Sequence, residues 1–287
     1  MYKFAVIDIG SNSVRLMLVA DGKVLYKTLN TTRLGEGIAL RPVLQRPNIE
    51  RTANAVADFY DRAKAEGAQD VYVFATAAVR SAENREEFLS AVKNFCGLDV
   101  EIISGEEEAT LGILGALGQA DGALIDVGGA SSELVVQRDQ KLVYKKSIDV
   151  GIVRLKDECG RDRERLEKVC NARVLEYGET PVLPTVYAIG GTATTLAALS
   201  LGLEQYNSAK VTGTEITQVQ MRDMADKLLK MSVEEIALLP CVSKGREDVL
   251  AGGAFWLATI MKRFNIQKVI VSDRDNLEGY AMRKGLL

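Results

Sequence analysis

The sequence contains no histidine. No imidazole can therefore act as a general base, accept a phosphoryl group or bind a metal ion. A bound metal would need oxygen ligands, which favours Mg²⁺ or another hard divalent cation. A general base would have to be Asp or Glu or, less often, Lys, Tyr or Cys.

Long apolar runs and paired cysteines are missing too. No stretch of about 18 or more apolar residues occurs, and the N-terminus lacks a secretory leader pattern, so we expect a cytoplasmic protein with no membrane partner. The four cysteines form no CxxC pair and are expected to be free thiols: Cys96, Cys159, Cys170 and Cys241. A net charge of −3 argues against general nucleic-acid binding.

The 287 residues suit two domains of ordinary size. Hydrophobic residues make up 47% of the chain and charged residues 26%, which indicates a folded globular protein rather than a disordered one.

The first part of the chain recurs further along it. Residues 5–16 align with residues 123–134, and residues 23–27 align with residues 141–145 without a gap. Asp8 falls on Asp126 and Gly10 on Gly128. Chance similarity between two apolar strands would not place Asp, Gly, Ser and a Lys-x-x-Tyr-Lys run in register, so we infer a duplication.

Each half is interpreted as β-β-β-α-β-α. Helical spacing of apolar residues predicts helices over 48–65 and 86–95, and buried strands are expected at 71–75 and 186–189. This order predicts an α/β fold of two similar domains facing each other across a cleft. The domains are expected at residues 1–121 and 122–275, and a final helix over 276–287 could pack back on the first domain.

Three loops rich in glycine and small polar residues follow predicted strands, at residues 8–15, 126–133 and 190–195. Their N–H groups could cradle a phosphate, and the third loop opens a helix whose N-terminus attracts anions. A single loop of this kind is more often a tight turn, but three of them, two duplicated, favour a phosphate site. The candidate phosphate-binding residues are Gly10, Ser11, Asn12, Ser13, Gly128, Gly129, Ser131, Gly191 and Thr192.

Several charged residues accompany these loops. Asp8 and Asp126 stand at mirrored strand ends and could hold a divalent cation, or each could cap its own turn. The next strand would carry Glu133 back towards the site. Arg80 could clamp phosphate oxygens or could be a solvated arginine at a helix start. Arg15 could contact phosphate, although an interdomain ion pair is favoured.

The acidic segment at residues 104–109 offers a candidate catalytic group. Ser104 and Glu107 have the spacing of a capping box, and acids suit the first turn of a helix. That explanation leaves Glu108 unassigned near the hinge between the domains. In a protein without histidine, this carboxylate could orient a water molecule for attack on phosphorus.

Five blocks together resemble the exopolyphosphatase / guanosine pentaphosphate phosphatase family, in the family's order: residues 8–15, 75–80, 103–109, 126–133 and 190–192. The resemblance implies a duplicated actin-like, ribonuclease H-like fold of the acetate and sugar kinase, actin and heat-shock chaperone superfamily. It implies Mg²⁺-dependent hydrolysis of a terminal phosphoanhydride, with Glu108 as the catalytic glutamate. Asp126 and Glu133 match the metal-side acids, and the Gly-rich blocks match the phosphate loops.

The sequence departs from the family pattern in places. Ala130 stands where many members have a third glycine, which predicts less room beside the loop, and Leu277 stands where an arginine is usual. Long members carry further helical domains, one of them a His/Asp phosphohydrolase domain. The early end of this chain and its lack of histidine favour short polyphosphates or guanosine polyphosphates as substrates. An ATP-dependent kinase or a non-catalytic guanosine polyphosphate sensor remains an alternative, and a homodimer is possible.

Overall fold

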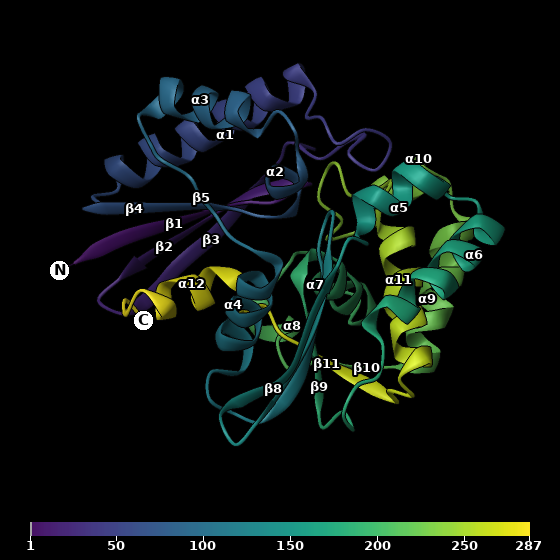
Figure 1. The fold of residues 1–287 in the computed structure, drawn as a ribbon. Coiled ribbons are helices and arrows are strands. Elements are labelled where there is room, and N and C mark those ends of the chain that lie inside the picture. The colour runs from purple at the N-terminus through teal and green to yellow at the C-terminus, as the bar shows by residue number, and fades with distance from the viewer. Residues whose placement is uncertain (1) are drawn as a thin grey trace.

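Two mixed β-sheets organise the computed structural model, which describes residues 2–287 (Figure 1). The first sheet has the order β3-β2-β1-β4-β5 and the second the order β10-β11-β9-β6-β7-β8. The strands of the first sheet are β1 (Lys3–Ile9), β2 (Ser13–Ala20), β3 (Lys23–Thr31), β4 (Asp70–Ala75) and β5 (Glu101–Ile102). Those of the second are β6 (Gly122–Val127), β7 (Ser132–Arg138), β8 (Lys141–Ile148), β9 (Val186–Ile189), β10 (Glu215–Thr217) and β11 (Lys268–Val271).

The duplication is visible in the strand pairing. In each sheet the first strand pairs antiparallel with the second and parallel with the fourth: β1 with β2 and β4, and β6 with β7 and β9. A break in register between Leu18 and Val19 recurs between Val136 and Gln137, at equivalent positions of the repeat. The strand β10 is an edge strand without a counterpart in the first sheet. The predicted duplicated α/β fold is confirmed.

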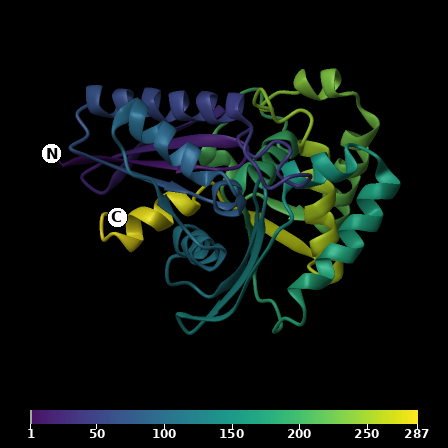
Figure 2. The ribbon, with the colours of Figure 1, turned by 45° about the horizontal axis from the view of Figure 1, so that its top comes forward.

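Helices cover the faces of both sheets (Figures 1 and 2). They are α1 (Arg46–Ala65), α2 (Ala77–Ser81), α3 (Arg85–Cys96), α4 (Gly105–Leu117), α5 (Ile152–Cys159), α6 (Arg163–Arg173), the 3₁₀ helix η1 (Val174–Tyr177), α7 (Gly190–Ser200), α8 (Ser208–Val211), α9 (Gln218–Lys230), α10 (Val233–Ala237), α11 (Leu250–Arg263) and α12 (Asn276–Arg283). The predicted helices over 48–65 and 86–95 correspond to α1 and α3. The predicted element order was wrong for the second half, where α5, α6 and η1 all precede β9.

The helices α4 and α12 lie side by side beneath the first sheet in both ribbon views (Figures 1 and 2). Ala109 and Ile113 of α4 share a buried cluster with Leu124 and Val135 of the second sheet. The helix α12 instead packs on the first sheet, where the Tyr280 ring stacks on Phe74 at 4.7 Å between centroids. We propose a domain boundary at residues 121/122, with α4 and α12 exchanged between the two halves.

Two glycines allow α4 and α12 to cross closely. A Cβ on Gly115 would lie 1.9 Å from the carbonyl oxygen of Asp275, and a Cβ on Gly279 would lie 1.9 Å from the carbonyl oxygen of Leu111. Any other residue would force the two backbones apart. This crossing holds the start of α12, and with it Asp275 and Asn276, at the edge of the cleft described below.

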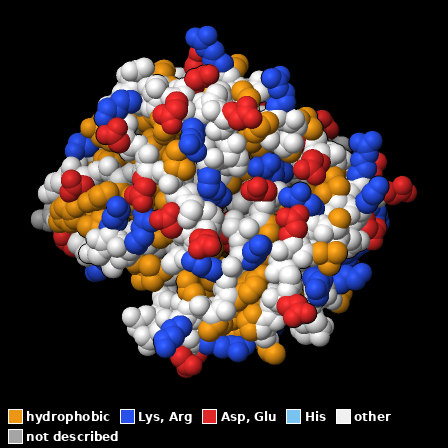
Figure 3. Space-filling view, viewed as in Figure 1, with side chains coloured by type: hydrophobic (Ala, Val, Ile, Leu, Met, Phe, Trp, Pro, Cys, Tyr) orange, Lys and Arg blue, Asp and Glu red, His pale blue; other side chains and the backbone are white. Residues whose placement is uncertain are grey.

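Charged side chains of both signs are interspersed on the face drawn in Figure 3. That face therefore shows no extended basic area of the kind that binds a nucleic-acid backbone. Among residues 2–287, every helix is too short or too polar to cross a lipid bilayer.

Candidate phosphate-binding cleft

A cavity of about 1950 Å³ lies between the two halves. The loops that follow β1, β6 and β9 all reach it, so the structure brings the three predicted phosphate loops together. The predicted residues that line the cavity are Asp8, Gly10, Ser11, Asn12, Ser13, Glu108, Asp126, Gly128, Gly129 and Gly191. Arg80, Ser131, Glu133 and Thr192 do not line it.

The first two loops have the same turn. The N–H of Gly10 donates to the carbonyl of Ser13 at 3.0 Å, and the N–H of Gly128 donates to the carbonyl of Ser131 at 3.0 Å. Gly129 lies directly against the other loop, because a Cβ there would be 2.6 Å from the Cβ of Ser11. The loops of the two halves are therefore in contact at the floor of the cleft.

Ala130 does not narrow the cleft as expected. Its side chain is fully buried, packs with the hydrophobic core of the first half and is absent from the lining of the cavity. The methyl group thus contributes to packing between the halves and takes up no space in the cavity.

Arg246, which the sequence did not single out, lies against the third loop. Gly190 has a positive φ of 83°, and a Cβ on Gly191 would lie 2.0 Å from Nη1 of Arg246. Arg246 lines the cavity and is only 8% exposed. Its guanidinium forms no ion pair with any carboxylate in residues 2–287, and burial, with Arg15 adding in the same direction, lowers its pKa to about 10. A buried cation facing a cavity without a counter-ion is suited to an anionic ligand.

Glu108 stands in the first turn of α4 and is 6% exposed. Burial raises the pKa of Glu108 to about 7; the charges of Asp126 and Asp8 act in the same direction, and Arg80 opposes them. Nη1 of Arg80 donates to Oε2 of Glu108 at 3.1 Å and to the carbonyl of Ile103 at 2.8 Å. Arg80 therefore holds the carboxylate rather than facing the cavity itself.

Asp126 and Glu133 belong to β6 and β7 of the second half; Asp126 lines the cavity and Glu133 does not. Burial raises the pKa of Asp126 to about 6 and raises the pKa of Glu133 well above its usual range, and the neighbouring carboxylates add to both effects. Asn276 donates to Oδ2 of Asp126 at 3.2 Å, and Ser147 donates to Oε1 of Glu133 at 2.7 Å. Oε2 of Glu133 has no hydrogen-bond partner, although it is buried.

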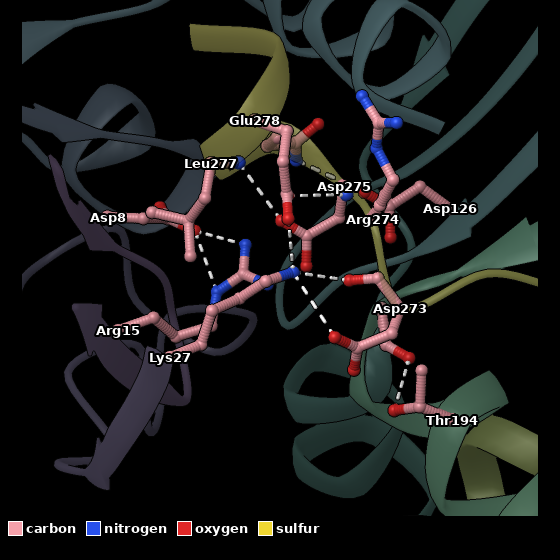
Figure 4. Close-up of polar contacts among 12 residues, drawn as sticks. Asp8, Arg15, Lys27, Asp126, Thr194, Asp273, Arg274, Asp275, Leu277 and Glu278 are labelled. Atoms are coloured by element: carbon pink, nitrogen blue, oxygen red, sulfur yellow. Dashed lines mark hydrogen bonds and ion pairs between the residues drawn. The ribbon is translucent and has the colours of Figure 1, made fainter. Parts of the chain in front are cut away.

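Asp8 is paired with Arg15, which also pairs with Asp275 at the start of α12 (Figure 4). Figure 4 shows Lys27 beside this group, with its Nζ 2.7 Å from Oε1 of Glu278 and 3.3 Å from Oδ2 of Asp273. Of the two roles considered for Arg15, the structure therefore places it in an ion pair. Oδ1 of Asp8 remains without a partner.

Ser131 and Thr192 turn away from the cleft. Both are 1% exposed. The Thr192 side chain lies beside Gly253 of α11, where a Cβ would be 2.8 Å from its Oγ1. These two residues shape the loops through their backbones and their packing.

The carboxylates suit a hard cation only together with other ligands. In residues 2–287, no three Asp, Glu or Cys side chains converge closely enough to hold a metal ion. Mg²⁺ is commonly bound through one or two carboxylates, with water and substrate phosphates completing its shell. Asp126 and Glu133 fit that pattern, because they are paired across β6 and β7, Asp126 lines the cavity, and Oε2 of Glu133 is buried without a partner. Burial first, and the neighbouring carboxylates second, raise both pKa values, and a bound cation would offset these effects.

The fold and the cleft define a class: an α/β protein of two similar halves, with duplicated glycine loops, a buried carboxylate and a buried arginine around one cavity. The profile of the Ppx/GppA phosphatase family matches residues 17–287, and the chain belongs to that family. It is accordingly a hydrolase that acts on phosphoric anhydrides.

Individual relatives agree with this assignment. The chain is 30% identical to exopolyphosphatase 2 of Mycobacterium tuberculosis, over 98% of both proteins. It is 27% identical to the guanosine-5'-triphosphate,3'-diphosphate pyrophosphatase of Vibrio cholerae, over 99% of this chain but 58% of that longer protein. The crystal structure of the Aquifex aeolicus family member has a TM-score of 0.79 and 30% identity, covering 99% of this chain and 98% of that one.

Proposed function

We propose that this enzyme removes the terminal phosphate of inorganic polyphosphate or of guanosine pentaphosphate. The named activities of the M. tuberculosis and V. cholerae relatives support these two substrates. The observation that carries the proposal is the convergence of three glycine loops, Arg246 and Glu108 in one cavity between the halves.

In the proposed mechanism, the loops and Arg246 bind the terminal phosphates. The N–H groups of the Gly-rich turns and the N-terminus of α7 offer donors to the phosphate oxygens, and Arg246 supplies a full positive charge. Phosphoryl transfer needs mainly positioning and charge neutralisation, which these groups provide. The side chain of Glu108, held by Arg80, orients the attacking water and accepts its proton.

A magnesium ion is part of this proposal. Asp126 and Glu133 would hold it, with Asp8 as a further candidate once Arg15 is displaced. Bound there, the ion would neutralise charge on the terminal phosphates. The cleft carboxylates would otherwise repel an anionic substrate, so chelation of divalent cations is expected to abolish turnover.

A phosphate-release assay tests the proposal directly. Polyphosphates of several lengths and the guanosine polyphosphates would be compared, each with Mg²⁺ and with chelator. Release from one of these classes is the expected result. ADP formation that requires an acceptor, or tight binding without any release, would instead indicate a kinase or a sensor and would overturn the proposal.

The pH profile should reflect the ionisation of Glu108. Because a water-activating carboxylate must be ionised and the pKa of Glu108 is raised to about 7, kcat should fall as the pH decreases below about 7. The expected slope is about tenfold per pH unit. Steady-state rates between pH 5 and pH 9 would measure it, and a flat profile over the acidic half would contradict the role of Glu108.

Replacing Arg80 with glutamine should move the acidic limb of the pH profile, where kcat falls with decreasing pH, to higher pH. The guanidinium favours the ionised form of Glu108, so its removal raises the pKa of that carboxyl further. Arg80→Lys should return the limb towards its original position, because it keeps the charge. A fall in rate without any displacement of the limb would contradict this interpretation of Arg80.

A further inference from the structure

A second polar cluster joins the two halves at the wall of the same cavity, which Arg33 and Glu247 line. Nη2 of Arg33 lies 3.1 Å from Oδ2 of Asp248 and 3.6 Å from Oε1 of Glu247. Nζ of Lys156 lies 2.8 Å from the same oxygen of Asp248 and 3.0 Å from Oε1 of Glu36. Arg33 and Glu36 follow β3 in the first half, whereas the other three residues belong to the second.

These contacts are more shielded than ordinary surface pairs. The side chains of Arg33 and Asp248 are 29% and 17% exposed. The i,i+4 pair Arg46–Glu50 on α1, in contrast, is 87% and 57% exposed. Exposed pairs contribute little because water screens them, whereas pairs shielded from water hold their partners more strongly.

Arg33 is tied to the first phosphate loop through its backbone. Its N–H donates to the carbonyl of Asn12 at 2.9 Å, and its own carbonyl accepts from Nδ2 of Asn48 at 2.9 Å. Arg33 also has a positive φ of 54°, which is uncommon for a residue with a side chain. The protein thus holds this residue in an unfavourable conformation that aims its guanidinium at the other half.

On the other side, the carboxylates paired with Arg33 directly follow Arg246 in the sequence. The N–H of Gly245 donates to Oε2 of Glu247 at 2.6 Å, which closes the turn around Arg246. A Cβ on Gly245 would lie 2.4 Å from Cγ2 of Thr31, so this turn touches the first half at its backbone.

We propose that Arg33 is a positioning residue, which acts through Asp248 and Glu247 to hold Arg246 over the third phosphate loop. This inference rests on the phosphatase function proposed above and adds how contact between the two halves supports anion binding. Arg246 has no carboxylate partner of its own among the described residues. Its carbonyl accepts from the N–H groups of Val249 and Leu250 at 3.2 Å and 2.9 Å, so its turn and the start of α11 together place it at Gly191. Because the ion pairs of Arg33 cross from one half to the other, contact between the halves and anion binding at Arg246 are coupled.

The test compares Arg33→Gln with Arg33→Lys, each alone and combined with Arg246→Gln, in the 287-residue enzyme with Mg²⁺. Arg33→Gln should raise KM for phosphate release about tenfold and change kcat less than about threefold, since the affected group binds substrate and does not activate water. Arg33→Lys should recover much of that loss. In the Arg246→Gln background, Arg33→Gln should add nothing, because its effect passes through Arg246. Arg46→Gln is the matched control and should behave as wild type.

Two results would overturn the inference: an unchanged KM in correctly folded Arg33→Gln, or effects that multiply in the double variant. Thermal denaturation of each variant identifies any that fail to fold, and Asp248→Asn then provides a second route to the same loss. The dissociation constant of inorganic tripolyphosphate, measured by titration calorimetry, gives a readout independent of turnover. If the wild-type enzyme releases no phosphate, the proposed function fails, whereas an unchanged tripolyphosphate affinity in Arg33→Gln still decides against the role of Arg33.

Discussion

Replacing Glu108 with glutamine should lower kcat by about 10²–10⁴-fold, the usual contribution of a positioned general acid–base group. Glutamine keeps the size of the side chain and can still accept a hydrogen bond from Arg80, but it cannot take a proton from water. KM should change little, because the phosphates are bound by the glycine loops and Arg246. Initial rates of phosphate release at saturating substrate would measure the effect.

Glu106 provides a matched control on the same turn of α4. Its carboxylate pairs with Lys145 at 2.9 Å and is 73% exposed, so Glu106→Gln should retain wild-type kcat. A Glu108→Gln enzyme that also kept wild-type turnover would remove Glu108 from the mechanism. Equal losses in both variants would instead point to the stability of α4 rather than to chemistry.

The internal repeat of the sequence correctly placed Asp8 and Asp126 at equivalent positions of the two sheets. Asp8 and Asp126 end equivalent strands because β1 and β6 are copies of one unit, and a strand followed by Asp-x-Gly has one compact continuation. The local pattern could not tell which side chains of each loop face outward. Ser131 and Thr192 are buried, Thr192 against α11 of its own half, and Ala130 packs into the core of the first half, so tertiary contacts decide these orientations.

Arg246 was missed for a different reason. Its turn precedes α11, has no counterpart in the first half and touches Gly191 only through the tertiary fold. The available signal was the run of Ser, Lys, Gly and Arg at residues 243–246, immediately before a strongly apolar helix. The packing of helix α4 could not be predicted either. Its apolar face predicts that the helix is buried but does not say which sheet will cover it.

The largest effect on stability is expected from Gly279→Ala. The added Cβ would lie 1.9 Å from the carbonyl oxygen of Leu111 and 2.6 Å from its carbonyl carbon, so α12 and α4 would have to separate. Overpacking against backbone, which cannot change rotamer, should lower the free energy of unfolding by about 3 kcal/mol, at the upper end of the usual range. Denaturation in urea followed by circular dichroism would measure this loss.

Gly252 in α11 is the control for the helix propensity of alanine. A Cβ there would meet nothing closer than 3.9 Å, so Gly252→Ala should leave stability unchanged or increase it by up to about 1 kcal/mol. Gly279→Ala should also impair catalysis at temperatures where it is folded, because α12 begins with Asn276, which holds Asp126, and is capped by Asp275, which holds Arg15. If Gly279→Ala proved as stable as Gly252→Ala, the close crossing of α4 and α12 would not be what holds the end of the chain against the cleft.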